Sequence, residues 1–220
     1  MRLLCLVMGV FVLSGQGMIE AGSIRGIVSV EVSAKQTQPK RYYMGPYRSG
    51  SRSDETPTDG PGNTVVYIEG LAGKPDSLTF RPEPVMVQKD ERFVPHVLPV
   101  KIGTSVGFPN QDDFYHNVFS VVSGDRFDLG RYAQGDTTYQ KFEKAGVVVV
   151  VRCEIHPGMK AYILVLDTDF FTVPKNNGAY VLSGMPAGSY QVTVWHPEHG
   201  ARSRLVSVPE VGETQVDFSF

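Results

Sequence analysis

Residues 147–167 read VVVVVRCEIHPGMKAYILVLD, and this stretch decides the fold. Two apolar runs flank a short segment that contains Cys153, His156 and Met159. Short apolar runs bounded by turn residues are consistent with buried β-strands. The stretch therefore predicts two strands joined by a tight loop, with the cysteine, the histidine and the methionine together on that loop.

The rest of the first part of the chain contains many further short segments with strand character. Residues 23–32 alternate polar and apolar side chains, as a half-buried strand does. Turn-forming residues such as Pro109-Asn110 separate the segments, and no segment has the long, capped 3.6-residue period of a helix. The other candidate strands are residues 64–69, 85–88, 94–100, 105–108, 116–121, 127–129 and 137–142. This spacing predicts an all-β chain, folded as an antiparallel sandwich or barrel.

A second, smaller unit is predicted over residues 167–220. An Asn-Gly pair within residues 176–180 is typical of a hairpin turn. Residues 186–188 (PAG) are read as the turn of a second hairpin, between strands at 181–182 and 190–195. Two last strands are expected at residues 205–208 and 214–218.

The N-terminal residues 1–21 have the order of regions of a signal peptide. A basic start is followed by an apolar run of 11 residues and then by small and polar residues. That run is short of the roughly 20 residues needed to span a bilayer, although an uncleaved anchor is the alternative. The leader implies export to the periplasm. Residues 34–63 are read as a long surface loop inserted into the first unit.

Composition narrows the function. The 220 residues contain 21 Lys and Arg and 23 Asp and Glu, for a net charge of −2, which gives no electrostatic case for binding nucleic acid. The two cysteines exclude a disulfide framework and a zinc site with several thiolates. Cys5 leaves with the leader, so Cys153 would be a single thiol in an oxidising compartment, where it must be buried, paired or bound to a metal.

Cys153, His156 and Met159 form the pattern C-x2-H-x2-M, and His116 opens a predicted strand upstream. One thiolate, two imidazoles and a thioether are a soft set of ligands. Two histidines and a cysteine with a weak axial methionine are the arrangement of blue-copper electron-transfer sites. Zinc would accept the imidazoles and the thiolate but gains little from a thioether.

The sequence H-N-V at residues 116–118, followed by C-x2-H-P-x-M, resembles the cupredoxins, and the short ligand loop is most similar to that of amicyanin. The stretch FVPHVLPVKIGTSVGFPNQD also resembles the plastocyanin-like proteins labelled methylamine utilization proteins. The resemblance covers about residues 23–167 without the 34–63 insertion. It implies a Greek-key β-sandwich over residues 22–166 that binds one type 1 copper ion. The implied metal ligands are His116, Cys153, His156 and Met159.

Three other residues receive roles near this site. By the resemblance, Asn117 would lock the ligand loop through hydrogen bonds. Pro157 has no N–H and a fixed φ, so it would stiffen the loop. His96 shares a face with apolar neighbours, which favours a core histidine, while an extra ligand or a hydrogen-bonding partner near copper remains open.

Two other groups of polar residues receive no catalytic or metal role. Two histidines in WHPEHG, His196 and His199, lie beside Pro197 and Gly200, which favours a simple loop over a metal site. Asp112 and Asp113 are not assigned to an acid–base pair.

The second unit resembles the carboxypeptidase regulatory-like domain through N-G-x-Y-x-L, P-x-G-x-Y-x-V and a closing W-H. That resemblance implies a small transthyretin-like β-sandwich without catalytic residues, with a structural or partner-facing role.

Together these features predict a periplasmic copper protein that shuttles single electrons between protein redox partners and is not an enzyme. After cleavage of the leader, no membrane span is expected. A copper-trafficking module, an accessory subunit of a periplasmic redox enzyme and a cupredoxin that binds no metal are the alternatives.

Overall fold

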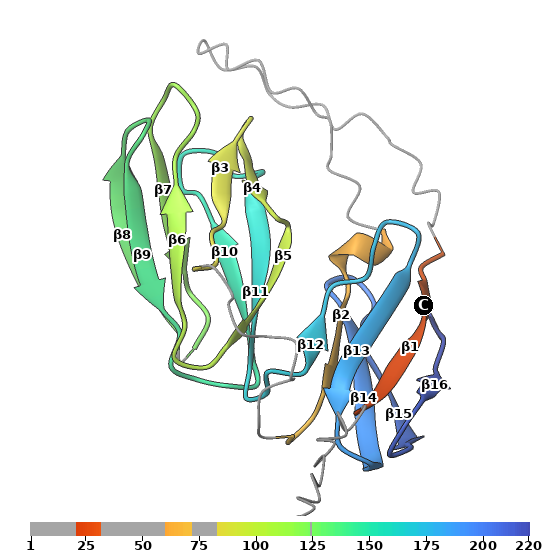
Figure 1. The fold of residues 1–220 in the computed structure, drawn as a ribbon. Coiled ribbons are helices and arrows are strands. Elements are labelled where there is room, and N and C mark those ends of the chain that lie inside the picture. Colours follow the sequence, from red (N-terminus) through yellow and green to blue (C-terminus); the bar gives the residue numbers. More distant parts are fainter. Residues whose placement is uncertain (1–20, 32–59, 72–82, 124) are drawn as a thin grey trace, which may run out of the picture.

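The structure, a computed structural model, describes residues 21–31, 60–71, 83–123 and 125–220. In these residues it is built of β-strands, apart from one 3-10 turn, η1 (Pro61–Asn63), which confirms the predicted all-β class. The strands form two β-sandwich lobes that lie side by side (Figure 1). We call the lobe built of β3 to β11 the first lobe, and the lobe built of β1, β2 and β12 to β17 the second lobe.

The first lobe contains a five-stranded sheet with the order β5-β11-β10-β7-β8. Its strands are β5 (Val97–Lys101), β7 (His116–Ser120), β8 (Phe127–Tyr132), β10 (Val147–Arg152) and β11 (Lys160–Leu166). All neighbours in this sheet are antiparallel except β5 and β11.

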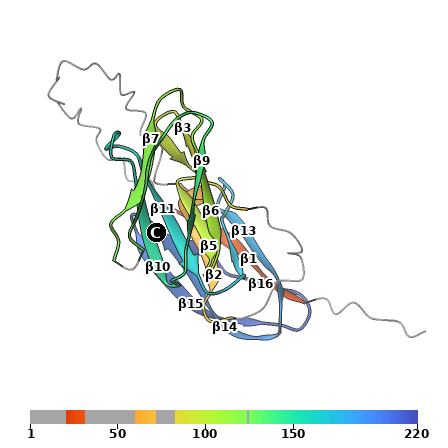
Figure 2. The same ribbon diagram turned by 90° about the vertical axis from the view of Figure 1, so that its left-hand side faces the viewer.

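The opposite layer of the first lobe consists of two strand pairs. They are β3 (Val87–Lys89) with β4 (Arg92–Val94), and β6 (Ser105–Pro109) with β9 (Thr137–Lys141). Parallel bridges from Val85 to Gly107 and from Gln88 to Asn110 join the two pairs. Figure 2 shows β3, β6 and β9 of this layer.

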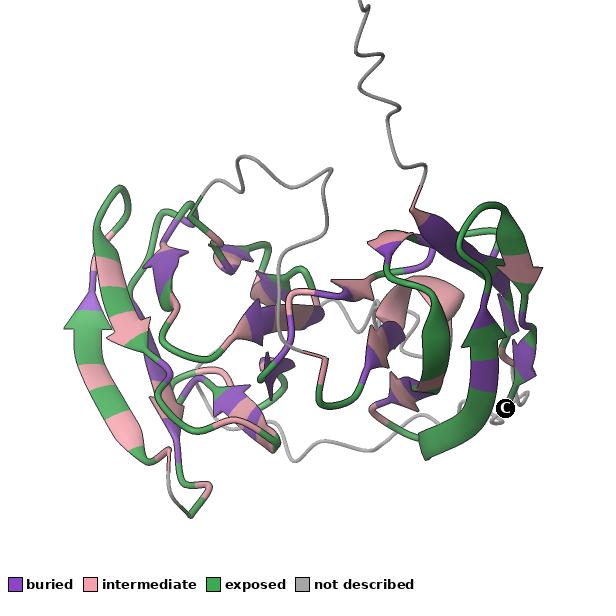
Figure 3. Ribbon diagram, turned by 60° about the horizontal axis from the view of Figure 1, so that its bottom comes forward, coloured by how far each residue is buried: buried purple, intermediate pink, exposed green. Residues whose placement is uncertain are grey.

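Strands β10 and β11 are apolar except for Arg152 and Lys160 at their paired ends, because one face lies in the core and the other is buried or half-buried. Val149 and Val151 on β10 and Ile163 on β11 lie in the core of the first lobe. Their neighbours Val150 and Leu164 belong instead to a cluster shared with the second lobe. Successive side chains of a strand point to opposite faces, so a strand covered on both sides needs apolar residues at every position. Figure 3 shows buried residues, in purple, on the strands of both lobes.

The second lobe is also a sandwich of two sheets. One has the order β13-β1-β16, with β17 also paired to β1, and the other has the order β12-β2-β14-β15. Its strands are β1 (Gly22–Ser29), β2 (Val65–Ile68), β12 (Phe171–Thr172), β13 (Ala179–Met185), β14 (Gly188–His196), β15 (Gly200–Val208), β16 (Glu213–Gln215) and β17 (Phe218–Ser219). Between the sheets lies a second apolar core that includes Ile24, Ile68 and Met185.

The strand pairing departs from the division into residues 22–166 and 167–220. β1 was expected in the first unit, but it pairs with β13, β16 and β17. β2 pairs with β12 and β14. The apolar residues of β1 and β2 indicate that the strands are buried, but they do not indicate which strands they pair with, so sequence order suggested the wrong neighbours.

Two predicted strand arrangements differ in detail. The strand expected over residues 94–100 is divided into β4 and β5 at Pro95, because proline cannot donate a ladder hydrogen bond. The turns near residues 178 and 186–188 exist, but each connects strands of different sheets rather than the two strands of a hairpin.

The leader prediction at residues 1–20 and most of the predicted surface loop fall outside the described residues. In the part of the chain that the structure describes, no helix has the length and apolar character needed to cross a membrane.

Candidate metal centre

Three side chains from two parts of the chain converge at one end of the first lobe. Cys153 and His156 lie on the loop between β10 and β11, and His116 is the first residue of β7. The Cys153 Sγ atom is 3.7 Å from Nδ1 of His116 and 3.7 Å from Nδ1 of His156. The two Nδ1 atoms are 3.0 Å apart. The loop predicted from the sequence therefore does meet the upstream histidine.

These three atoms fit a metal ion in size and in chemistry. A point equidistant from them lies about 2 Å from each, close to the length of metal–nitrogen and metal–sulfur bonds in proteins. One thiolate and two imidazoles form the trigonal set of a blue-copper site. Among the described residues, this is the one group of three or more His, Cys, Asp or Glu side chains with converging ligand atoms.

The ligand loop is short and tied at both ends. Arg152 pairs with Lys160 at the ends of β10 and β11, and the N–H of Met159 donates to the carbonyl of His156 at 2.9 Å. Pro157 lies exposed in the turn between them. The loop is thus closed by the strand ladder and by its own backbone.

Met159 is buried, with 2% of its surface exposed, and belongs to the same core cluster as Cys153. The structure therefore places the methionine inside the lobe, next to the loop that carries the other predicted ligands.

Asn117 joins the two segments that carry the ligands. Its Oδ1 accepts a hydrogen bond from the backbone N–H of Glu154 at 2.6 Å, directly after Cys153. Its Nδ2 is 3.5 Å from Asp128 on β8. A contact of this kind is what the resemblance implied for this residue.

His96 is not part of the cluster. Its ring packs edge-on against Tyr162 with ring centroids 5.4 Å apart, and Tyr162 lies in the apolar cluster between the lobes. Its Nε2 has no hydrogen-bond partner among the described residues, and burial lowers its pKa. The structure thus places His96 beside the lobe interface rather than beside the other histidines.

The charge state of the cluster follows from its contacts. Burial alone would raise the pKa of the Cys153 thiol, but hydrogen bonds from His116, Asn117 and His156 lower it to about 6. Burial alone would lower the pKa of His116, but its contacts with Cys153 and Asp112 raise it. The cluster therefore favours a thiolate, the form of cysteine that binds metals.

Two residues near the cluster had no role in the sequence analysis. The carboxylate of Asp112 lies 2.7 Å from Nε2 of His116. The ring of Phe114 has its centroid 5.0 Å from that of His116 and 5.3 Å from that of His156. Both residues lie between β6 and β7, where no strand period reports which way a side chain points.

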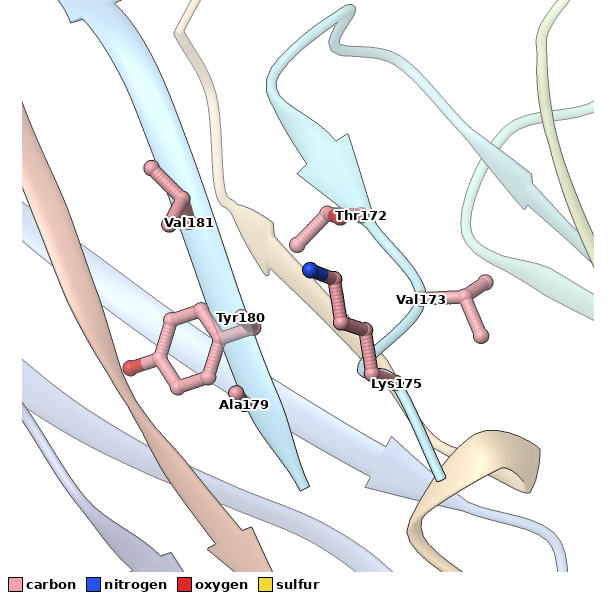
Figure 4. A pocket seen from close by; sticks show the side chains of 6 residues that line it. All are labelled: Thr172, Val173, Lys175, Ala179, Tyr180 and Val181. Carbon is pink, nitrogen blue, oxygen red and sulfur yellow. The ribbon is translucent and has the colours of Figure 1, made fainter. Parts of the chain in front are cut away.

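Two other sites in the second lobe carry no comparable cluster. The rings of His196 and His199 are neighbours, but no third ligand group joins them among the described residues. A surface pocket between β12 and β13 contains no His, Cys, Asp or Glu in its lining (Figure 4). The pocket is lined by Thr172, Val173, Lys175, Ala179, Tyr180 and Val181.

Comparison with known proteins gives structural likenesses only. No protein-family profile and no curated protein matches the chain. It is similar to the Cu-containing nitrite reductase from Thermus scotoductus SA-01, at 28% identity and a TM-score of 0.36, over 43% of this chain and 24% of that one. This chain thus spans about a quarter of the nitrite reductase.

Two smaller proteins are similar over almost their whole length. A purple cupredoxin from Nitrosopumilus maritimus has 22% identity and a TM-score of 0.34, over 37% of this chain and 98% of its own. A methionine-to-alanine variant of amicyanin in its Cu(I) form has 19% identity and a TM-score of 0.36, over 46% of this chain and 97% of its own.

Proposed function

We propose that this chain is a mononuclear copper protein of the cupredoxin type, which transfers single electrons between protein partners. The observation that carries the proposal is the triangle formed by Sγ of Cys153 and the Nδ1 atoms of His116 and His156. Met159 would supply a weak thioether ligand to the same ion, because it lies buried in the same core as the cysteine.

When bound, copper supplies a one-electron couple, and the chain keeps the ligands in place. Cys153 directly follows β10 and His116 opens β7, so both belong to the same sheet. Asn117 fixes the loop through Glu154. Ligands that are already arranged need little movement when the charge of the metal changes, and this favours fast electron transfer.

His156 is the proposed point of electron exit. It is half-buried, whereas His116 is completely buried. The surface near it carries exposed apolar side chains, with 38% of Phe114, 59% of Tyr115 and 37% of Ile155 exposed. Apolar surface around a partly exposed ligand suits a protein partner that docks and leaves. We propose a carrier rather than an enzyme, because these ligands account for the whole centre.

Reconstitution of the full chain with Cu(II) tests the proposal. We expect one copper ion per chain and an intense visible band from thiolate-to-copper charge transfer. A fully loaded, correctly folded protein without that band would contradict the proposed type 1 site. Voltammetry then separates the alternatives, because a carrier cycles without losing copper and a trafficking module releases it on reduction.

We also propose that the leader directs the chain to the periplasm. Residues 167–220 of the second lobe, which resemble a carboxypeptidase regulatory-like domain, would have a structural or partner-facing role. Mass measurement of the protein from the periplasmic fraction tests export. The expected mass lacks the first 17 to 21 residues, and retention of the full-length chain in the cytoplasm would contradict export.

A further inference from the structure

The carboxylate of Asp112 is surrounded by hydrogen-bond donors. The side chain is buried, with 8% of its surface exposed. Oδ1 accepts a hydrogen bond from the backbone N–H of Asp90 at 2.6 Å. Oδ2 accepts one from the N–H of Glu91 at 3.1 Å and lies 2.7 Å from Nε2 of His116. Both oxygens are therefore occupied as acceptors.

The two backbone donors belong to the turn between β3 and β4. Asp90 and Glu91 both have a φ of 54°, in the left-handed region that residues other than glycine rarely adopt. Two-residue hairpin turns of this kind prefer Asn-Gly, so the sequence itself does not favour the conformation. Successive N–H groups in such a turn form a concave anion-binding site, and the carboxylate of Asp112 fills it.

The backbone of Asp112 is also held by a residue close to it in sequence, Asn110. Asn110, which is almost completely buried, accepts a hydrogen bond from the N–H of Asp112 at 3.0 Å. The Nδ2 of Asn110 donates to the carbonyls of Phe114 and Tyr132. The position of the carboxylate is therefore fixed by contacts that do not involve Cys153 or His156.

This arrangement requires a proton on Nε2 of His116. A carboxylate whose oxygens already accept two N–H bonds can pair with Nε2 only if Nε2 is itself a donor. A metal ion at the cluster would take the place of any proton on Nδ1, and Nδ1 would then supply its lone pair to the point that it shares with Cys153 and His156.

We propose that Asp112 is a positioning residue of the metal centre, which fixes the ring and the protonated nitrogen of His116 and ties the β3–β4 turn to the site. The inference deepens the proposed function and rests on it for the identity of the metal. The contacts that carry it involve only residues of the chain, so part of the test needs no metal.

The first experiment is nuclear magnetic resonance on the metal-free full chain labelled with 15N-histidine. We expect a slowly exchanging proton on Nε2 of His116 in the wild type and loss of that signal in Asp112→Ala. The neighbouring variant Asp113→Ala removes an exposed carboxylate and should retain the signal. A proton on Nδ1 instead, or rapid exchange of Nε2–H in the wild type, would overturn the proposal without any variant.

The second experiment is a Cu(I) competition titration of the same variants. Loss of a hydrogen-bond partner of a metal-binding histidine typically weakens metal affinity about 10- to 100-fold, and we expect that loss for Asp112→Ala. Asp113→Ala should keep the wild-type affinity, because it removes an exposed carboxylate that takes no part in these contacts. Unchanged affinity in folded Asp112→Ala would overturn the positioning role.

The outcomes separate this inference from the proposed function. If the wild type shows the protected Nε2–H but no copper band, the proposed copper site is contradicted, and the proposed arrangement of His116 and Asp112 still holds. If the wild type binds copper with the expected band and Asp112→Ala matches it in both measurements, the positioning role of Asp112 is contradicted. The proposed copper site then still holds. If Asp112→Ala fails to fold, Asp112→Asn replaces it. An amide that keeps its oxygen on Nε2 of His116 must point its NH2 group at the N–H of Asp90, so that two donors face each other and the contact is weakened.

Discussion

The ring centroids of His116 and His156 in the first lobe are 4.7 Å apart, and those of His196 and His199 in the second lobe are also 4.7 Å apart. In the first pair the two Nδ1 atoms face each other at 3.0 Å, with Cys153 Sγ at 3.7 Å from each. The rings are steeply inclined, at 67°. Their nitrogens therefore share a point in space that a metal ion can occupy.

The second pair is arranged for packing. Nδ1 of His196 accepts a hydrogen bond from the N–H of Glu198 at 3.1 Å. The rings of His196 and His199 both lie against Phe220, and the angle between the two histidine rings is 34°. Equal ring separation thus accompanies different chemistry, and what differs is the direction of the nitrogens and the presence of a thiolate.

The largest expected difference between the two histidine pairs is the effect of removing the thiolate of Cys153. Cys153→Ser should abolish the visible charge-transfer band completely, because a hydroxyl cannot supply the thiolate-to-copper transition. His199→Ala should leave the band unchanged. Absorption spectra of the copper-loaded proteins check both, and a band that survives in Cys153→Ser would assign the colour to another group.

The next largest effect compares the histidines directly. His156→Gly should weaken copper affinity by at least about 100-fold, more than the loss of a mere neighbour of a ligand, and added imidazole should restore part of the colour. His199→Gly should bind copper like the wild type. Competition titration with a chelator measures both. Equal losses in the two variants would place the copper between the lobes or in the second one.

The third prediction uses acid. The pKa of Cys153 is lowered to about 6, so metal-free protein should gain thiolate absorbance in the ultraviolet with a midpoint near that value. Because protons compete for the sulfur, copper affinity should fall by up to about tenfold for each pH unit below the midpoint. A thiolate midpoint near that of an ordinary thiol would show that the histidines do not stabilise the anion.

The same shift has a consequence for folding. A lowered pKa of a thiol stabilises the metal-free protein above the thiol's unfolded pKa, and that stabilisation is lost as the pH falls through about 6. The raised pKa of His116 acts in the opposite sense, and its contribution is lost as the pH rises through its folded value. Denaturant unfolding of Cys153→Ser and the wild type at several pH values measures the contribution of the thiol together with its coupling to His116.

The smallest effect concerns Met159, the proposed thioether ligand. Met159→Leu and Met185→Leu replace buried methionines in the first and second cores, and each should cost less than about 1.5 kcal/mol of stability. Only Met159→Leu should raise the reduction potential, because a lost donor destabilises the oxidised ion more. Voltammetry and thermal unfolding measure the two effects, and an equal potential in both variants would remove Met159 from the site.

The loop that carries Cys153 and His156 could be predicted from the sequence because the residues that determine it are neighbours in the chain. The apolar runs on either side of Cys153 specify two strands. A cysteine, a histidine and a methionine at this fixed spacing are suited to few metal ions. The runs have no alternation because the second lobe covers the outer face of β10 and β11, which includes Val150 and Leu164. This also explains why those strands were recognisable as buried.

The parts that could not be predicted depend on contacts between distant segments. β1 alternates like any half-buried strand, and only its pairing with β13 places it in the second lobe. The turn at Asp90 and Glu91 lacks glycine and is stabilised by Asp112, more than 20 residues away. Asp112 therefore had no sequence signal, since neither a strand period nor a motif links it to His116.

X-ray absorption at the copper edge of the loaded full chain tests the central claim most directly. We expect one sulfur and two nitrogen donors within roughly 2.0 to 2.3 Å of the metal, the bond lengths of comparable protein sites. A first shell made only of nitrogen and oxygen, or a sulfur signal that persists in Cys153→Ser, would contradict the convergence of Cys153, His116 and His156 on one copper ion.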